Sequence, residues 1–191
     1  MSATLSAAQR HALVELARGA IAERFGAAPA SVPAEAWLEE KRAVFVTLTL
    51  GGALRGCVGQ LEPRFSLAEA VRHAAQAAAF RDERFLPLAA DELPRVAVEI
   101  SVLSPLEPLP ADSEAEALAA VRPGVDGLVL RCGGRSGVFI PEMWKQLPDA
   151  RDFLFHLKRK AGLPGELWTP GTHLERFTAE LVDEHALGGA A

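Results

Sequence analysis

The stretch AVFVTLTLGGALRGCVG, residues 43–59, predicts a β-hairpin and decides the class of the fold. Residues 43–50 are rich in β-branched side chains, and the run is short enough to be a strand buried on both faces. Gly51 and Gly52 are a two-residue turn signal, because glycine accepts the positive φ angles of the turns that join hairpin strands. The chain should therefore return from Ala53 as a second strand, antiparallel to the first.

Helices are predicted on either side of this hairpin. The first spans residues 5–25 and the second residues 66–80, and each begins with a capping box, in which the side chains of two residues satisfy free backbone N–H groups. The capping pairs are Ser6 with Gln9 and Ser66 with Glu69. Residues 95–103 follow as a strand, since large apolar side chains alternate with smaller or polar ones.

The remaining elements repeat these types. Residues 114–121 and 149–161 are predicted helices, residues 127–141 a second hairpin that turns near 133–137, and residues 174–182 a last strand. Strands pair through hairpins, and helices come between them without a strict β-α-β alternation. This organisation favours an α+β fold with a mainly antiparallel β-sheet flanked by helices.

The composition argues against several classes of protein. The 191 residues carry a net charge of −5 without a concentrated basic block, which disfavours nucleic acid as a partner. No apolar run reaches the ~20 residues that a membrane span needs, and the N-terminus lacks the arrangement of a signal peptide. Two cysteines are too few for a disulfide framework or a four-thiolate zinc site. We therefore expect a cytoplasmic protein with reduced thiols, no metal site and no membrane partner.

The second strand of the hairpin carries a cysteine close to an arginine. In a regular strand, residues two apart share a face, so Arg55 and Cys57 should point to one side. Leu54 and Val58 would then anchor the other side in the core, leaving the guanidinium and the thiol towards a cleft. A neighbouring arginine favours the thiolate, and desolvation opposes it. A structural role, a ligand contact and a nucleophilic or redox role for Cys57 thus all stay open.

Three further charged residues are candidates for the same cleft. In one interpretation, Asp82 and Arg84 form a local turn network, and Glu99 pairs with an arginine on a solvated strand face. In the other, Arg55 and Arg84 clamp an anionic group, and Glu99 serves as a general acid or base. The sequence alone leaves both interpretations open, with the first favoured.

Glycines mark two further places. Gly56 and Gly59 leave room for a ligand or for another backbone to come close. The run at residues 133–137 could cradle a phosphate, although a hairpin turn explains it more simply. The chain has no dinucleotide fingerprint and no P-loop, so a cofactor stays unknown.

Five stretches, in order along the chain, resemble the AMMECR domain family. They are LRGCVG (54–59), AAAFRDERF (77–85), ELPRVAVEISVLSP (92–105), GVFIPEMW (137–144) and FLFHLKRKAGLP (153–164). The first resembles the family's signature hexapeptide, with Val58 in place of isoleucine. The second departs from the family's pattern at Glu83, and the fourth departs at Glu142 and Met143. The resemblance covers roughly residues 8–182, nearly the whole chain.

The resemblance implies a fold but no reaction. The fold would be a single two-lobed α+β domain over residues 1–185, with a larger sheet lobe and a smaller lobe, followed by a flexible tail at 186–191. The family has no established biochemical activity. One function that stays open is a small-molecule-binding or enzymatic domain with a cleft around LRGCVG, acting on a small anionic ligand. Its catalytic residues would be Cys57 and Glu99, and its ligand-binding residues Arg55, Gly56, Gly59, Asp82 and Arg84.

The alternative function is that of a non-catalytic partner. The chain is similar in style to the branch called AmmeMemoRadiSam system protein A, which is encoded alongside a Memo-like protein and a radical SAM enzyme. That similarity implies these two proteins as partners.

Overall fold

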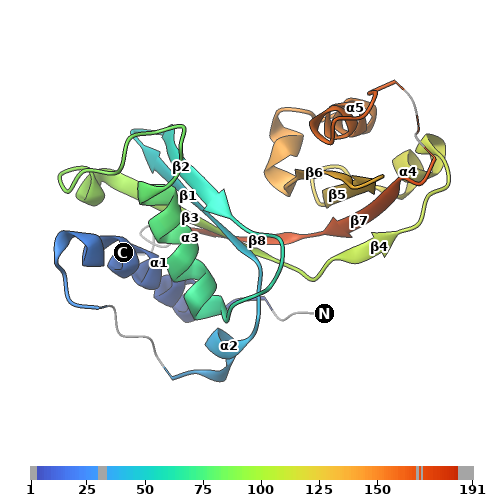
Figure 1. Ribbon diagram of the computed structural model, residues 1–191. Coiled ribbons are helices and arrows are strands. Elements are labelled where there is room, and N and C mark those ends of the chain that lie inside the picture. Colours follow the sequence, from blue (N-terminus) through green and yellow to red (C-terminus); the bar gives the residue numbers. More distant parts are fainter. Residues whose placement is uncertain (1–3, 30–33, 167, 169, 185–191) are drawn as a thin grey trace. The chain divides into compact units, whose positions relative to one another are not determined.

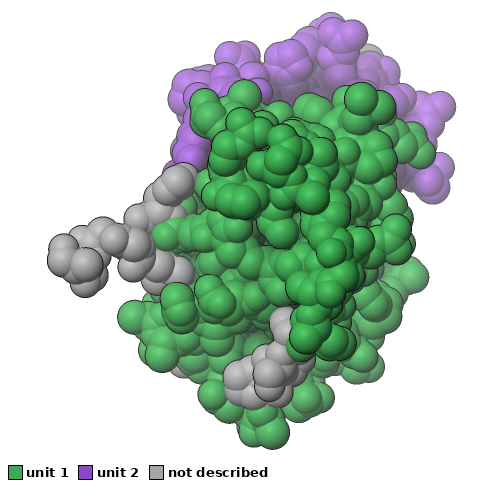
Figure 2. Space-filling model, turned by 90° about the vertical axis from the view of Figure 1, so that its left-hand side faces the viewer, with its two compact units in different colours: residues 1–103, 180–191 green, residues 104–179 purple. Residues whose placement is uncertain are grey.

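The computed structural model describes residues 4–29, 34–166, 168 and 170–184 of the chain (Figure 1). The chain divides into two compact units, Met1–Leu103 with Glu180–Ala191, and Ser104–Ala179 (Figure 2). Each unit contains a four-stranded sheet and helices, and every strand pair whose register is described is antiparallel. The predicted α+β class is confirmed. The tail predicted at 186–191 lies outside the described residues.

The first unit contains both predicted N-terminal helices and the predicted hairpin. Its helices are α1 (Ala7–Ala22), α2 (Ala36–Glu39) and α3 (Leu67–Phe80). In sheet order, its strands are β2 (Ala53–Gly59), β1 (Val44–Leu50), β3 (Val96–Leu103) and β8 (Ala179–Asp183). Short 3₁₀ helices lie at Glu23–Phe25 and Leu93–Arg95. Both capping boxes are present, with Ser6 and Ser66 as the N-caps.

One face of this sheet packs against α1 and α3 (Figure 1). Val44, Val46 and Leu48 of β1 are buried on that face, and they lie beside Val98 and Ile100 of β3. The side of α3 that meets them is mostly alanine. Small side chains let a helix approach a sheet closely. The close packing of α3 on the sheet buries apolar surface, and this burial stabilises the core.

The β1–β2 hairpin departs from a regular ladder at one residue. The two glycines of its turn have φ angles of 59° and 81°, as the predicted turn requires. Leu48 lies opposite Gly56, but Thr49 lies opposite Leu54, so Arg55 is an extra residue in β2. Such a β-bulge interrupts the alternation of side chains between the two faces of a strand.

The second unit is a smaller sheet covered by a helix. In sheet order, its strands are β4 (Glu107–Leu109), β7 (His173–Phe177), β5 (Gly127–Cys132) and β6 (Arg135–Phe139). Its helices are α4 (Glu114–Ala120) and α5 (Ala150–Lys160), with a 3₁₀ turn at Pro141–Lys145. The ring of Trp144 stacks on Phe153 with 3.8 Å between centroids. The buried Lys158 ammonium is paired with Glu114 at 2.8 Å.

The last predicted strand, residues 174–182, is two strands. β7 and β8 belong to different sheets, and Thr178 stands between them with its N–H donating to the Ser104 side chain at 2.9 Å. A run of strand-forming residues does not show where a chain changes sheet. Two short elements, α2 and β4, have no counterpart among the predicted elements. β4 contains Pro108, which is tolerated because β4 is an edge strand.

Candidate functional site

Both glycines of the LRGCVG stretch are required by close packing within the first unit. A Cβ atom on Gly56 would lie 2.1 Å from the carbonyl oxygen of Ala78, so α3 can rest on β2 only because this position has no side chain. A Cβ atom on Gly59 would lie 2.4 Å from Cγ of the Phe45 ring. The sequence suggested that these glycines leave room for a ligand or for another backbone. The geometry shows that other atoms of the protein approach them closely.

Arg55 is tied to the loop that follows α3. Its Nε and Nη2 each donate to one carboxylate oxygen of Glu92 at 2.9 Å, and its Nη1 donates to the Leu86 carbonyl at 2.9 Å. The Arg55 and Glu92 side chains are 14% and 18% exposed. The hydrogen bonds from Arg55 lower the pKa of Glu92 to about 2, and Glu92 in turn raises the pKa of Arg55. The guanidinium is therefore engaged by the protein itself.

Cys57 lies in a row of polar side chains that crosses the sheet. Thr47 of β1 is opposite both Cys57 of β2 and Glu99 of β3. The Thr47 hydroxyl donates to the Cys57 sulfur at 3.2 Å, and the thiol is half-buried. Directly opposite residues share a face of a sheet, so the two residues predicted to be catalytic lie on one face with Thr47 between them.

Asp82 and Arg84 cap the free edge of β2. β2 is an edge strand, and the backbone groups of Cys57 are on its open side, where Asp82 accepts from the N–H at 2.8 Å and Arg84 donates to the carbonyl at 3.3 Å. Arg84 also binds both oxygens of Asp82, which holds the pKa of that carboxyl well below its usual range. This is the local turn network that the sequence allowed. It satisfies backbone groups that an edge strand leaves open.

The bulge at Arg55 explains where the expected arrangement of β2 is wrong. Leu54, expected in the core, lies opposite Thr49 and is 44% exposed. Val58 packs against the core as predicted. The two arginines of the expected anion clamp each bind a carboxylate of the protein itself. The guanidinium of Arg55 and the neighbouring thiol thus have separate partners within the protein.

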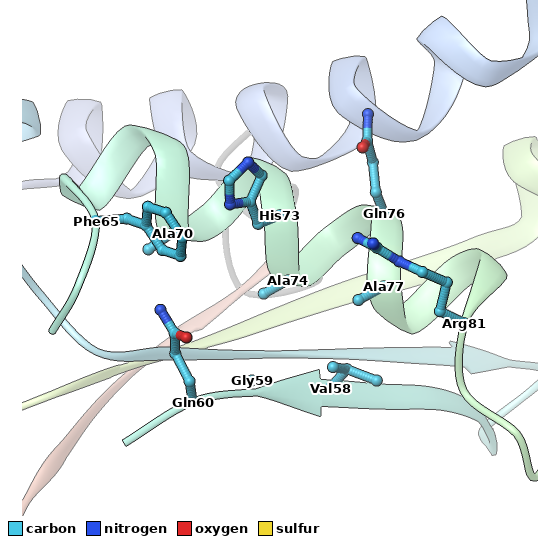
Figure 3. Close-up of a pocket in the computed structure, with 10 residues that line it drawn as sticks. All are labelled: Val58, Gly59, Gln60, Phe65, Ala70, His73, Ala74, Gln76, Ala77 and Arg81. Atoms are coloured by element: carbon cyan, nitrogen blue, oxygen red, sulfur yellow. The ribbon is translucent and has the colours of Figure 1, made fainter. Parts of the chain in front are cut away.

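A pocket of about 360 Å³ lies between α3 and the second half of β2 (Figure 3). We call it the α3–β2 pocket. It is lined by Val58, Gly59, Gln60, Phe65, Ala70, His73, Ala74, Gln76, Ala77 and Arg81. Two of these residues belong to LRGCVG, and none of the other residues predicted for the site is among them.

The α3–β2 pocket has an apolar floor and a polar rim. The alanines of α3 and Val58 of β2 form the floor, with Ala74 and Ala77 directed at β2 (Figure 3). The Phe65 and His73 rings meet edge to face with 4.7 Å between centroids. Arg81 is exposed at the end of α3, and among the described residues its guanidinium has no hydrogen-bonding or ion-pair partner.

This pocket was not among the predicted features, although one signal for it exists. The alanine-rich run within residues 66–80 predicts that another element approaches the helix closely. The same small side chains that let α3 touch β2 at Gly56 leave space beside that contact. A sequence does not distinguish an alanine that is covered by a neighbour from an alanine that faces a gap.

Among the described residues, no group of three or more His, Cys, Asp or Glu side chains is placed so that it could hold a metal ion. Cys57 and Cys132 are both free thiols. Within the described ranges, every helix is too short or too polar to cross a bilayer.

The fold and the pocket define a class: an α+β protein of two compact units, each with its own four-stranded sheet, and a pocket at the edge strand of the first. Comparison with known proteins gives the family. Residues 14–182 match the family described as AMMECR1, and the chain therefore belongs to the AMMECR1 family. The predicted resemblance to this family is confirmed.

Relatives cover nearly the whole chain. A protein of Methanothermobacter thermautotrophicus is 39% identical over 187 residues, which is 95% of this chain and 97% of the relative. A protein of Thermococcus gammatolerans is 41% identical over 186 residues, or 90% and 88% of the two chains. The crystal structure of the uncharacterized protein PH0010 from Pyrococcus horikoshii has a TM-score of 0.80 at 36% identity and covers 88% of each chain.

Proposed function

We propose that this AMMECR1-family protein binds a small molecule in the α3–β2 pocket. One contrast carries the proposal. Arg55, Asp82 and Arg84 are all used to hold the loop after α3, whereas the pocket beside them offers apolar surface and a guanidinium without a partner among the described residues. Small-molecule sites combine a mostly apolar lining with a few polar groups in volumes from about 300 Å³ upwards. The α3–β2 pocket has that composition and size.

Binding accounts for the surroundings of Cys57 better than thiol chemistry on the same ligand does. Val58 faces the helices and lines the pocket, so its neighbour Cys57 faces the other side of the strand. The Cys57 sulfur is hydrogen-bonded by Thr47, and its backbone is capped by Asp82 and Arg84. A ligand in the pocket is therefore separated from the thiol by the strand itself.

The proposal is tested by filling the pocket. ¹H–¹⁵N NMR spectra are recorded during titration with indole-3-acetate and, separately, with indole-3-acetamide. At least one probe should shift signals of residues 58–60 and 70–81, and Ala77→Leu should abolish the shifts because the larger side chain occupies the gap. Ala115→Leu, at an exposed position of α4, is the matched control and should leave them unchanged. Shifts that cluster around Cys57 and Glu99, or that persist in Ala77→Leu, would contradict the proposal.

We propose as a second function that the protein is a non-catalytic partner of a Memo-like protein and a radical SAM enzyme. The observation that favours it is an exposed apolar side chain in a fixed position. Leu86 is 84% exposed, and its carbonyl is held by Arg55. Exposed apolar residues that gather into a patch mark docking sites, and Pro87, Ala89 and Ala90, which follow Leu86, are exposed as well.

Calorimetric titration with the purified Memo-like protein of the same organism tests this second proposal. Leu86→Glu should weaken the association at least about tenfold, because a charged group at the centre of an apolar contact is costly. Val125→Glu, at another exposed apolar residue (45% exposed), is the control and should have no effect. No association, or equal association of wild type and Leu86→Glu, refutes the proposal.

A further inference from the structure

We infer that the ligand of the α3–β2 pocket is a small carboxylate with a flat, ring-containing body. The carboxylate would bind the Arg81 guanidinium, and the ring would lie against Phe65 and His73. This inference rests on the proposed function and names the ligand class of the same pocket. Three observations support it: the charge of the lining, the guanidinium of Arg81, which is unpaired among the described residues, and the positions of the aromatic rings and the guanidinium along α3.

The lining favours a negative charge. None of its ten residues is an aspartate or a glutamate, and Arg81 is the residue among them with a permanent positive charge. Other arginines of the first unit are neutralised within the protein: Arg10 by Glu180, Arg55 by Glu92 and Arg72 by Glu23. A planar guanidinium presents paired N–H groups that match the two oxygens of a carboxylate. Arg81 has this capacity unused among the described residues.

The end of α3 does not compete for Arg81. The Ala77 carbonyl accepts from the backbone N–H of Arg81, and the Ala79 carbonyl accepts from the N–H of Leu88. Carbonyls in the last turn of a helix attract cationic side chains unless they are already satisfied. These two carbonyls have backbone partners, and the Arg81 side chain has no hydrogen-bond or ion-pair partner among the described residues, so it is available to the pocket. In Figure 3 it turns back along α3 in the direction of His73.

The two ends of the pocket differ in chemistry. Phe65 and His73 lie at one end and Arg81 at the other (Figure 3). Arg81 directly follows α3 and is eight residues from His73, which corresponds to about 12 Å between their backbones along the helix axis. The Arg81 side chain reaches back into this span, and Ala74, Ala77 and Val58 form its apolar floor. One or two fused rings with a carboxylate on a short linker would fit between the two rings and the guanidinium, with Gln60 at the rim as a further hydrogen-bonding group.

The same features disfavour a polyphosphate ligand. Phosphate groups are usually held by several cationic side chains or by a series of backbone N–H groups at a helix N-terminus. Here the lining has one arginine and no lysine, and the N-terminus of α3 is satisfied by its own capping box, Ser66 with Glu69. A single guanidinium beside an apolar floor matches a single negative charge on an apolar body.

Three probes that share one body and differ in charge test the inference. Indole-3-acetate is an anion, indole-3-acetamide is neutral and tryptamine is a cation. We expect indole-3-acetate to bind the wild-type protein about five- to tenfold more tightly than indole-3-acetamide at low ionic strength, with tryptamine weakest. The readout is the dissociation constant from NMR titration of the signals of residues 58–60 and 70–81.

Substitutions at Arg81 identify the source of the selectivity. Arg81→Gln should reduce the affinity for indole-3-acetate to that for indole-3-acetamide and leave the latter unchanged, while Arg81→Lys should keep part of the preference. Arg95→Gln, at an exposed arginine outside the lining, is the matched control and should keep the full preference. Unfolding temperatures of all variants show that the fold persists.

The outcomes separate this inference from the proposed function. Equal affinities of wild type for indole-3-acetate and indole-3-acetamide, with both lost in Ala77→Leu, would overturn the ligand class and keep the binding pocket. A preference for the anion that survives Arg81→Gln would also overturn the inference, because another cation would then be responsible. Loss of both probes to the same extent in Arg81→Gln would assign Arg81 to the shape of the pocket instead of to the charge of the ligand.

Discussion

Two parts of LRGCVG, residues 54–57 and residues 58–59, have opposite uses in the first unit. In the first part, the Arg55 side chain and the Cys57 backbone are bound by residues of the loop 81–92. In the second part, Val58 and Gly59 line a pocket whose guanidinium, on Arg81, has no partner among the described residues. Charged residues gathered around a motif can thus serve the fold, while the groups available to a ligand are those that the fold leaves unsatisfied.

The first part, residues 54–57, also holds the pocket in shape. We call the contacts of loop 81–92 with Arg55 and Cys57 the loop contact. Gly56 sets how closely α3 lies on β2, and the loop contact fixes the chain as it leaves α3. Changes in residues 54–57 should therefore alter stability before they alter binding, and changes in residues 58–59 should do the reverse.

The largest effect is expected from Gly56→Val. A Cβ atom at this position would lie 2.1 Å from a backbone oxygen of α3, and backbone cannot move aside as a side-chain end can. We expect the free energy of unfolding to fall by about 3 kcal/mol, measured by chemical denaturation. Ala53→Val, at an exposed position of the same strand, should change it by less than about 0.5 kcal/mol. Similar losses in both variants would mean that α3 does not rest on Gly56.

Glu92→Gln should have the next largest effect. It removes the negative partner of Arg55 in a pair that is mostly buried, and we expect a loss of about 2 kcal/mol in the free energy of unfolding. The matched control is Asp91→Asn, since the Asp91 side chain is 81% exposed and its pair with Arg95 is at the surface. That variant should cost less than about 0.5 kcal/mol. Equal costs would show that the loop contact contributes no more than a surface pair.

Acid should weaken the same contact in a defined pH window. The ordinary pKa of Glu92 is 4.5, and its folded value is lowered to about 2, so the unfolded chain binds a proton where the folded protein does not. The stability from this pair is therefore fully present above about pH 4.5 and is lost as the pH falls towards about 2. Asp82 acts in the same direction, because its pKa is also lowered.

The unfolding temperature measured across this window checks the assignment. The wild-type value should decline as the pH is lowered, and Glu92→Gln should decline less steeply because the titrating group is absent. Identical slopes for the two proteins between pH 4.5 and 2 would exclude Glu92 as a contributor.

The smallest effect is expected from Cys57→Ser. A serine hydroxyl can take the place of the sulfur beside Thr47, and the backbone bonds to Asp82 and Arg84 do not depend on the side chain. We expect a change of less than about 1 kcal/mol in the free energy of unfolding and no change in the affinity for indole-3-acetate. A loss of probe binding in this variant would bring the thiol back into the site.

Much of the fold follows from local sequence. The hairpin turn is encoded by Gly51 and Gly52, whose φ angles are positive, and the starts of α1 and α3 are encoded by serines that form capping boxes. In each of these signals, the interacting residues lie within two to four positions of one another, so the sequence alone identifies all of them. The separation of β7 from β8 at Thr178 has no such local signal, because it depends on which sheet each strand joins.

The site depends on contacts between distant residues, and these could not be predicted. Arg55 and Glu92 are 37 residues apart, and Cys57 and Asp82 are 25 apart. The sequence showed that the two arginines of the expected clamp could bind anions but not that the protein supplies those anions itself. The bulge at Arg55 is equally hidden, because one extra residue in a strand leaves the hydrophobic pattern almost unchanged.

A crystal structure of the protein with indole-3-acetate at saturating concentration would show which groups hold the ligand. We expect the indole ring between α3 and β2, against Phe65 and His73, and both carboxylate oxygens within hydrogen-bonding distance of the Arg81 guanidinium. We also expect the bonds between Arg55 and Glu92 to remain intact. A probe bound on the sheet face of Cys57 and Glu99, or a carboxylate bound by Arg55 or Arg84, would contradict the proposed site.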